Sequence, residues 1–180
     1  MKTKTPEIEY IADAEVDAQM DAALRLLLSS SFTEERDAFF KERRYYKEYP
    51  HHRWFIRDEQ QALIAHVAVH EKHVLRENET FRFGGISEVC VHPNTRGCGY
   101  VKKLLNEVHT WLRSRNFPYA ILFGKTEYYG SSGYAPVSNL YLETEIDENI
   151  VQHYPENCLV ASLGHQPWPK ENVFLPGPTF

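Results

Sequence analysis

Residues 84–112 read GGISEVCVHPNTRGCGYVKKLLNEVHTWL. The first third predicts a strand, because Ile86, Val89 and Val91 are β-branched, and the glycine pair before them indicates a bulge or a close approach of the backbone. Residues 92–95, His-Pro-Asn-Thr, end this strand because proline cannot continue the ladder. The last third predicts an amphipathic helix, whose single apolar face comprises Val101, Leu104, Leu105, Val108, Trp111 and Leu112.

The loop between this strand and this helix has the composition of an anion site. Glycines at 97 and 99 let the backbone come close to a ligand. The first N–H groups of a helix have no internal partner, and the helix dipole favours negative charge there. Arg96 adds further donors, so the loop predicts a phosphate or pyrophosphate site. An ordinary strand-to-helix turn is the alternative.

The segment V-H-P-N-T-R-G-C-G-Y-V resembles the acetyl-CoA signature of the Gcn5-related N-acetyltransferase (GNAT) superfamily. Five positions match, and Val101 departs, since Gly or Ala is usual there. The resemblance covers about residues 50–140. It implies an α/β fold with a mixed, mostly antiparallel sheet that is split at the cofactor strand and flanked by helices. It also implies acetyl-CoA as co-substrate, with the pantetheine on Val89, Cys90 and Val91, a strand N–H as oxyanion site, and the pyrophosphate on Arg96, Gly97, Cys98, Gly99, Tyr100 and Val101.

A second segment, from Glu127 to Tyr134, supports this resemblance. Tyr129, three residues, Gly133 and an aromatic residue resemble the family motif Y-x-x-x-G-[FY]. The motif places the tyrosine beside the thioester sulfur, where a phenol can protonate the departing CoA thiolate. We therefore expect Tyr129 to be the general acid, with Tyr128 as the alternate. Without the motif, both would be interpreted as ordinary packed or surface aromatics.

Glu88 is the candidate general base, because an ammonium substrate must lose a proton before it attacks. An exposed glutamate on the outer face of the strand is the alternative. The run S-E-V-C-V-H-P-N-T-R-G-C-G-Y-V is also similar to aminoglycoside 2′-N-acetyltransferases and, in its glutamate, to rhizobial nodulation acyltransferases. In the former the glutamate is a water-mediated base. Their C-terminal segment implies that Trp168 lies near the acceptor, and the family implies the same for Tyr45 and Tyr46.

Length and composition predict one domain, residues 1–180. The formal charge of −5 argues against nucleic acid as a partner. Three cysteines at unrelated spacings predict a reducing compartment and no zinc site. The N-terminus lacks a signal-peptide pattern and no apolar run could span a membrane, so we expect a cytoplasmic protein. A homodimer remains open.

The rest of the chain alternates between short elements. We expect the Arg- and Tyr-rich region around 36–55 to be a solvated face, and residues 143–148 to form an acidic loop. The C-terminal tail should pack back as an edge segment. His66, His70 and His73 read as surface histidines, not as metal ligands. Predicted strands are 7–12, 53–57, 62–70, 81–91, 119–123, 140–142 and 158–163, and predicted helices are 14–28, 34–46 and about 100–112.

These features together predict an acetyl-CoA-dependent N-acetyltransferase that acts on a small primary amine by direct attack. Three other activities remain open. An acyltransferase that uses acyl-carrier protein would prefer long acyl donors, and a protein N-acetyltransferase would modify a lysine or an N-terminus. A sensor that binds acyl-CoA without turnover is the alternative that is not an enzyme.

Overall fold

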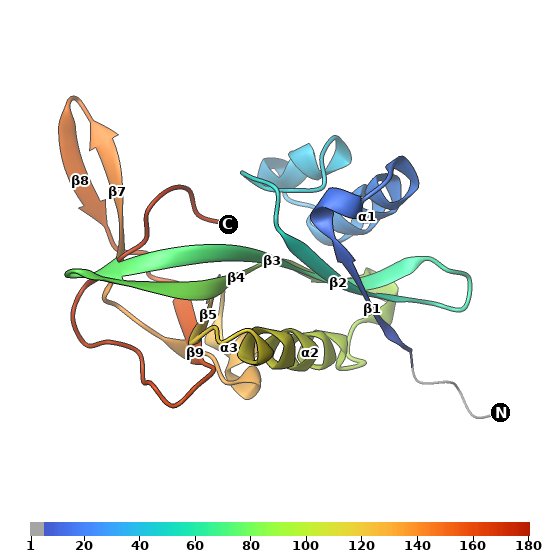
Figure 1. Cartoon of the computed structure of the whole chain (residues 1–180). Helices are drawn as coiled ribbons and strands as arrows, with labels where there is room; N and C mark the ends of the chain where they lie inside the picture. Colours follow the sequence, from blue (N-terminus) through green and yellow to red (C-terminus); the bar gives the residue numbers. More distant parts are fainter. Residues whose placement is uncertain (1–5) are drawn as a thin grey trace. The chain divides into compact units, whose positions relative to one another are not determined.

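The computed structural model describes residues 6–180, which divide into two compact units (Figure 1). Unit 1 comprises residues 6–70, 87–108 and 180, and unit 2 comprises residues 71–86 and 109–179. Strands β3 and β4 and helix α2 run from one unit into the other.

Unit 1 is built on antiparallel strands at the start of the chain. Strand β1 pairs with β2, Ile8 opposite Ile56, and β2 pairs with the first half of β3, His52 opposite Val69. The strands are β1 (Ile8–Ala12), β2 (His52–Arg57) and β3 (Leu63–Arg76), and the helical segments between β1 and β2 are η1 (Asp13–Glu15), α1 (Ala18–Ser31) and η2 (Glu35–Lys41).

Helix α1 starts and ends later than the predicted 14–28. The Asp17 side chain accepts a 2.8 Å hydrogen bond from the Met20 N–H, which makes Asp17 the N-cap. Three serines, residues 29–31, lie in its last turn, where the Ser30 hydroxyl donates to the Leu27 carbonyl. The apolar side of α1 packs into a core that contains Met20, Leu24, Leu27, Leu28, Phe40, Phe55, Leu63 and Cys90.

The predicted helix 34–46 is wrong in type and length. Residues 35–41 form a 3₁₀ helix, and the chain is irregular from there to β2. The physical reason lies at Arg44, whose carbonyl accepts from the Arg53 guanidinium at 2.9 Å while its own guanidinium binds Asp13 and Asp21. These long-range bonds hold the backbone out of a helix.

The strand, loop and helix predicted within residues 84–112 are confirmed as β4 (Glu79–Val91), η3 (Pro93–Thr95) and α2 (Tyr100–Ser114). The close approach predicted at the glycine pair is confirmed at Gly84, since a Cβ there would lie 2.6 Å from a methyl of Leu112. Within β4, Glu88 has a left-handed backbone, with φ of 50°.

Unit 2 contains the parallel pairing of β4 with β5 (Tyr119–Phe123), which covers only Phe83 to Gly85. Beyond Gly85, β4 has no registered partner in β5, so the sheet is split at this strand as expected. On its other edge β5 pairs antiparallel with β9 (Cys158–Ser162), which also pairs with β6 (Ala135–Pro136). The pairings are mostly antiparallel and helices flank the strands, which confirms the predicted fold class.

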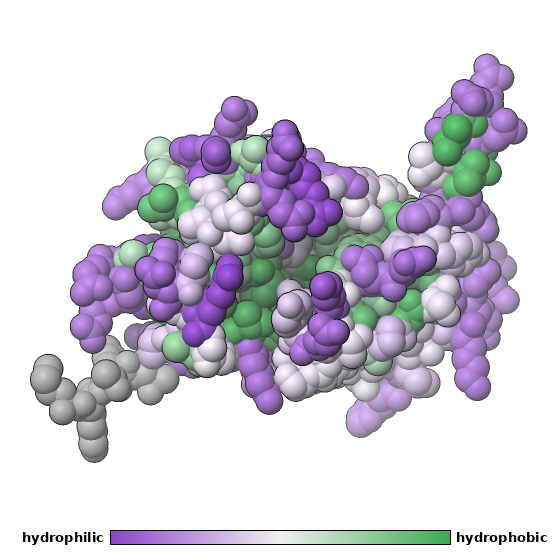
Figure 2. All heavy atoms as spheres, turned by 180° about the vertical axis from the view of Figure 1, so that it is seen from behind, coloured by the Kyte–Doolittle hydropathy of each residue, from purple (hydrophilic) through white to green (hydrophobic). Residues whose placement is uncertain are grey.

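The prediction that residues 143–148 form an acidic loop is wrong. Residues 140–153 form a hairpin of β7 (Leu140–Ile146) and β8 (Asn149–His153), joined at Asp147 and Glu148, both with positive φ. Figure 2 shows hydrophobic atoms among polar ones on this hairpin, at the upper right, and its exposed apolar residues are Ile146, Ile150 and Val151.

The C-terminal tail does not form the expected edge segment. Its short strand β10 (Val173–Phe174) pairs antiparallel with β3 at Leu75 and parallel with β7 at Leu140 and Tyr141. The tail therefore fills a place between two strands, which explains why it is so rich in apolar residues.

Candidate active site

Glu88 lies in β4 in unit 1, where its backbone is left-handed, and its side chain is only 3% exposed. One carboxylate oxygen accepts from the Arg53 Nη1 at 2.9 Å. The other accepts from the backbone N–H of Tyr46 at 3.2 Å. Glu88 is therefore a buried carboxylate with a fixed orientation. The alternative interpretation, an exposed glutamate, is wrong.

Arg53 is the centre of the network that holds this carboxylate. Its fully buried guanidinium also donates from Nε to Asp13 at 2.6 Å. Arg44 binds the other oxygen of Asp13 and reaches Asp21, which Arg25 also binds. Three carboxylates thus face three guanidinium groups, so negative and positive groups are equal in number within this network. The expected solvated face is wrong at Arg44 and Arg53, and the one sequence signal for this was an arginine inside the apolar strand HRWFIR.

The environment of Glu88 raises its pKa to about 7. Burial is the largest cause, because it disfavours the charged form, while the Arg53 guanidinium and the Tyr46 N–H act in the opposite direction. A carboxylate with this pKa exchanges a proton near neutral pH, which suits a general base.

His66 packs beside Glu88 and is fully buried, so the prediction of a surface histidine is wrong. Its Nδ1 lies 2.9 Å from the Glu88 carbonyl, and its Nε2 lies 3.2 Å from Arg53 Nη1. Because a carbonyl only accepts and a guanidinium only donates, the proton belongs on Nδ1. Burial, followed by the charge of Arg53, lowers the pKa of His66 to about 3, so this imidazole is neutral. His70 is buried as well.

The loop after β4 has the backbone geometry of an anion site. Gly97 and Gly99 have φ of 82° and 73°, and a Cβ at either would meet nothing, so conformation and not space requires glycine. Helix α2 begins at Tyr100, and its first turn holds no acidic residue. Arg96 is exposed beside this turn. These features favour an anion at the first N–H groups of α2.

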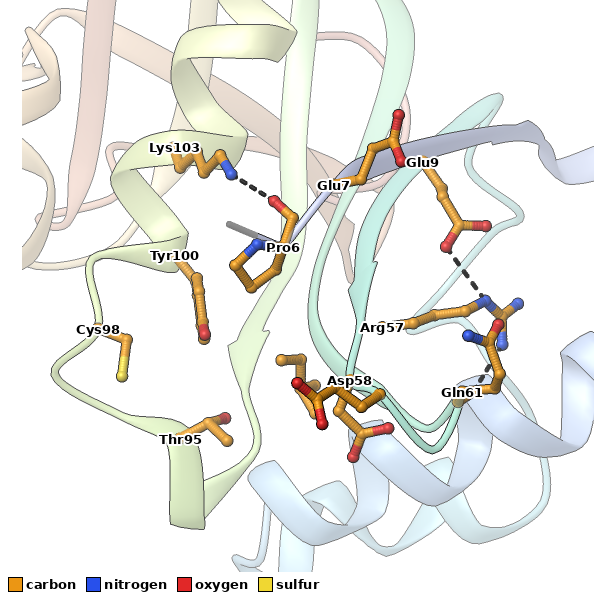
Figure 3. A pocket seen from close by; sticks show the side chains of 12 residues that line it. Pro6, Glu7, Glu9, Arg57, Asp58, Gln61, Thr95, Cys98, Tyr100 and Lys103 are labelled. Carbon is orange, nitrogen blue, oxygen red and sulfur yellow. Dashed lines mark hydrogen bonds and ion pairs between the residues drawn. The ribbon is translucent and has the colours of Figure 1, made fainter. Parts of the chain in front are cut away.

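A cavity of about 720 Å³ lies beside this loop, between the first residues of β1, the β2–β3 turn and the start of α2 (Figure 3). The side chains of Cys98 and Tyr100 point toward it. Its walls carry four carboxylates against two cations, and one of these, Arg57, already pairs with Glu9. Negative walls repel a pyrophosphate, so the backbone of the loop, and not this cavity, fits the anion.

Val89, Cys90 and Val91, the residues expected to bind the pantetheine, could do so through their backbone groups. Val89 and Val91 are half-buried, whereas the Cys90 thiol faces the core beside Leu63 and α1. Burial raises the pKa of Cys90 to about 12, so the thiol is neutral.

Tyr129 ends the short helix α3 (Thr126–Tyr129) in unit 2 and is half-buried. Its ring passes so close to Gly124 that a Cβ there would lie 2.7 Å from the ring. Gly133 of the same motif has φ of 91°, which explains its glycine. Tyr128 is 67% exposed and lacks this setting.

Tyr134, the last residue of the motif, contacts the ring of Tyr129. Its ring centroid lies 6.2 Å from that of Tyr129 in an edge arrangement, and its hydroxyl lies 2.8 Å from His109 Nε2. Burial raises the pKa of Tyr134 well above its usual value and lowers the pKa of His109 to about 4. Both groups are therefore neutral, and they position the Tyr129 ring.

The three residues expected near the acceptor have different settings. In unit 1, Tyr46 is exposed and its N–H binds Glu88, while Tyr45 packs on Tyr49 with ring centroids 4.1 Å apart. In unit 2, Trp168 donates from Nε1 to Asn139 at 2.8 Å and its ring meets Tyr119 edge-on. The structure thus brings Tyr46 to Glu88.

Two features are absent from residues 6–180. No group of three His, Cys, Asp or Glu side chains could hold a metal ion. No helix in this part of the chain is long and apolar enough to cross a membrane.

The arrangement, with a mixed sheet that parts at β4 and a glycine-bearing loop that opens α2, is that of a GNAT acetyltransferase. A family model described as "Acetyltransferase (GNAT) domain" matches residues 10–137, and the chain belongs to this family. A search of curated proteins gave no match.

Solved structures share the fold at low sequence identity. The Escherichia coli GNAT family N-acetyltransferase YhbS, in complex with CoA, is 17% identical, with a TM-score of 0.69 over 97% of this chain and 93% of its own. A GNAT family acetyltransferase from Brucella melitensis, in complex with acetyl-CoA, is 16% identical, with a TM-score of 0.59 over 93% and 94%. E. coli ElaA is 15% identical, with a TM-score of 0.59 over 88% and 100%.

Proposed function

We propose that this protein transfers the acetyl group of acetyl-CoA to a primary amine of a small molecule. The observation that carries the proposal is Glu88, a buried, hydrogen-bonded carboxylate with a pKa of about 7 in the strand that leads into the anion-binding loop. Family membership supplies the reaction class, and the E. coli and Brucella structures were obtained with CoA and acetyl-CoA.

In this proposal the backbone of Val89–Val91 binds the pantetheine, and residues 96–101 bind the pyrophosphate. A strand N–H at Val89 or Cys90 polarises the thioester carbonyl. Glu88 accepts a proton from the reacting nitrogen through a water, because both of its oxygens already accept hydrogen bonds from Arg53 and Tyr46. Tyr129 protonates the CoA thiolate, and Tyr45, Tyr46 and Trp168 contact the acceptor.

The narrower resemblance to aminoglycoside 2′-N-acetyltransferases supports a small amine as acceptor and a water-mediated glutamate. It rests on the segment around Glu88 and on the C-terminal segment that contains Trp168. We place the reaction in the cytoplasm, since the three cysteines are free. The formal charge of −5 suits a cationic acceptor.

The experiment incubates the purified protein with acetyl-CoA and a panel of polyamines, aminoglycosides and peptides, and reads the products by mass. We expect a small amine to gain one acetyl group. Acetylation of peptides alone would instead identify a protein N-acetyltransferase. Transfer from an acyl-carrier protein but not from CoA, or binding of acetyl-CoA without release of CoA on any acceptor, would overturn the proposal.

The role of Glu88 has its own test. In wild type, kcat/KM for the acceptor should rise with pH through an ionisation near 7, because the base must lose its proton first. Glu88→Gln should lose this ionisation and about 10²-fold or more in rate. An unchanged pH profile in Glu88→Gln would exclude Glu88 as the base.

A further inference from the structure

A second chain of polar groups begins at the residue before Glu88. The hydroxyl of Ser87 lies 3.1 Å from His70 Nε2. The other ring nitrogen, Nδ1, lies 3.8 Å from a carboxylate oxygen of Glu48. Ser87 and His70 are buried, with 8% and 2% exposed, whereas the Glu48 side chain is 38% exposed. The chain therefore connects a buried hydroxyl to solvent through an imidazole.

This chain lies on the same side of β4 as the Glu88 network. His66 and His70 stand four residues apart on β3 and so share one face of the strand. His66 contacts Glu88 and His70 contacts Ser87. The segment before β2 contacts both pairs. Its Tyr46 N–H binds Glu88, and its Glu48 carboxylate faces His70. Residues 87 and 88 of β4 thus each pair with a histidine of β3, side by side.

The proton balance of the proposed reaction leaves a role for a second proton acceptor beside Glu88. An ammonium R–NH₃⁺ and acetyl-CoA give an amide R–NH–acetyl, CoA–SH and one H⁺. The nitrogen loses two protons, one before attack and one after it. The sulfur gains only one, so the other must reach solvent. The Glu88 side chain is 3% exposed, whereas Glu48 opens to water.

We propose that Ser87 and His70, in place of Glu88, remove the proton that the ammonium loses before attack, and that Glu88 takes the proton that the nitrogen loses after it; this inference rests on the proposed function. An N–H bond of the ammonium breaks as its proton passes to Ser87 Oγ, and the hydroxyl proton passes to His70 Nε2. Ser87 touches the acceptor and His70 acts through it. The imidazolium then carries its positive charge beside the Glu48 carboxylate and releases a proton to water.

The surroundings of His70 suit this role. Besides Glu48 and Ser87, the groups that lie against its ring include His51, edge-on at 6.4 Å, and the ring of Phe180, at 5.7 Å. The Glu48 carboxylate is negatively charged and stabilises a protonated ring. A hydroxyl within reach of an imidazole that a carboxylate faces is the arrangement by which a base acts through a hydroxyl.

The test compares wild type with Ser87→Ala, His70→Gln and Glu48→Gln, and His73→Gln is the matched control. Gln keeps a hydrogen-bonding group near the position of Nε2 but cannot take up a proton. His73 is an exposed histidine of the same strand, outside this chain of groups. Acceptors are primary amines made progressively less basic by electron-withdrawing substituents, and kcat/KM is measured at one neutral pH. Thermal melting and acetyl-CoA affinity verify that each variant folds.

For the most basic amine, Ser87→Ala and His70→Gln should lose about 10²-fold or more in kcat/KM, and Glu48→Gln less. The loss should shrink toward none for amines that are already neutral, because these need no deprotonation. His73→Gln should match wild type throughout. A purely structural role would lower activity equally for all amines, and that result would overturn the inference.

The two proposals fail differently. If wild type acetylates amines and Ser87→Ala responds equally to all of them, or not at all, the inference alone is wrong. If His70→Gln does not fold, Ser87→Ala and the exposed Glu48→Gln decide the matter by the same comparison. If wild type acetylates no amine although it binds acetyl-CoA, the proposed function is wrong, and the inference falls with it.

Discussion

Replacing Arg53 by methionine tests the buried network that orients Glu88. The guanidinium is fully buried and binds Asp13, Glu88 and the Arg44 carbonyl at 2.6 to 2.9 Å. Removing one partner of a buried ion pair costs about 3–5 kcal/mol. In the variant Asp13 still has its ion pair with Arg44, at 2.9 Å, so Glu88 is the carboxylate that loses its cation.

The size of the loss should depend on pH. The folded pKa of Glu88 is about 7, above its ordinary 4.5, and without Arg53 it rises further. A raised carboxyl pKa means that the folded state holds the proton more tightly, so its contribution to stability is present at low pH and is lost as pH rises. We expect Arg53→Met to cost about 3 kcal/mol at pH 6, where Glu88 is protonated, and more at pH 8.

The assay is urea unfolding at both pH values, with Arg57→Met as the control. Arg57 lies on the same strand but is partly exposed and pairs with the exposed Glu9, so its loss should cost only about 0–1 kcal/mol. A loss below about 1 kcal/mol for Arg53→Met, or the same loss at pH 6 and pH 8, would refute the reasoning.

Three further predictions concern single positions. Gly124→Ala places a Cβ 2.7 Å from the Tyr129 ring, so kcat should fall about 10- to 100-fold while acetyl-CoA affinity, measured by calorimetry, stays unchanged; a normal kcat would show that the ring position is unimportant. Gly97→Ala puts a side chain at φ of 82°, which costs about 1–2 kcal/mol, and calorimetry should show weaker acetyl-CoA binding; equal affinity would argue against this loop as the site. His109 has a folded pKa of about 4 against 6.5, so the unfolded state binds the proton first and stability is lost as pH falls below 6.5. Between pH 7 and pH 5, the free energy of unfolding of His109→Gln, measured in urea, should fall by about 2 kcal/mol less than that of wild type. An identical pH dependence in the two proteins would contradict this.

Local sequence signals predicted the part of the fold that positions the cofactor. The strand, loop and helix in residues 84–112 follow from β-branching, a proline stop, glycines and a period of 3.6 residues, and each is a property of neighbouring residues. The structure adds a reason for three glycines, because Gly97, Gly99 and Gly133 all have positive φ.

The parts that failed depend on distant partners. The 3₁₀ helix at 35–41 ends early because Arg44 bonds Asp13 and Arg53, and neither contact leaves a periodic trace in the sequence. The burial of His66 and His70 was missed because a strand covered on both faces does not alternate in polarity. The strand predicted at 140–142 is the start of β7, and residues 143–146 were predicted as a loop because this part of the strand is exposed and mostly polar. The pairing of Ser87 with His70 joins two strands and had no signal in either one.

The assignment of Tyr129 as the acid is tested most directly by comparing Tyr129→Phe with Tyr128→Phe. The first variant removes only the hydroxyl from a half-buried ring, and the second removes it from the exposed neighbour. With the acceptor found in the panel, we expect kcat of Tyr129→Phe to fall about 10²–10⁴-fold, with acetyl-CoA affinity unchanged and Tyr128→Phe equal to wild type. A normal kcat in Tyr129→Phe, or a loss confined to Tyr128→Phe, would contradict the assignment of the acid.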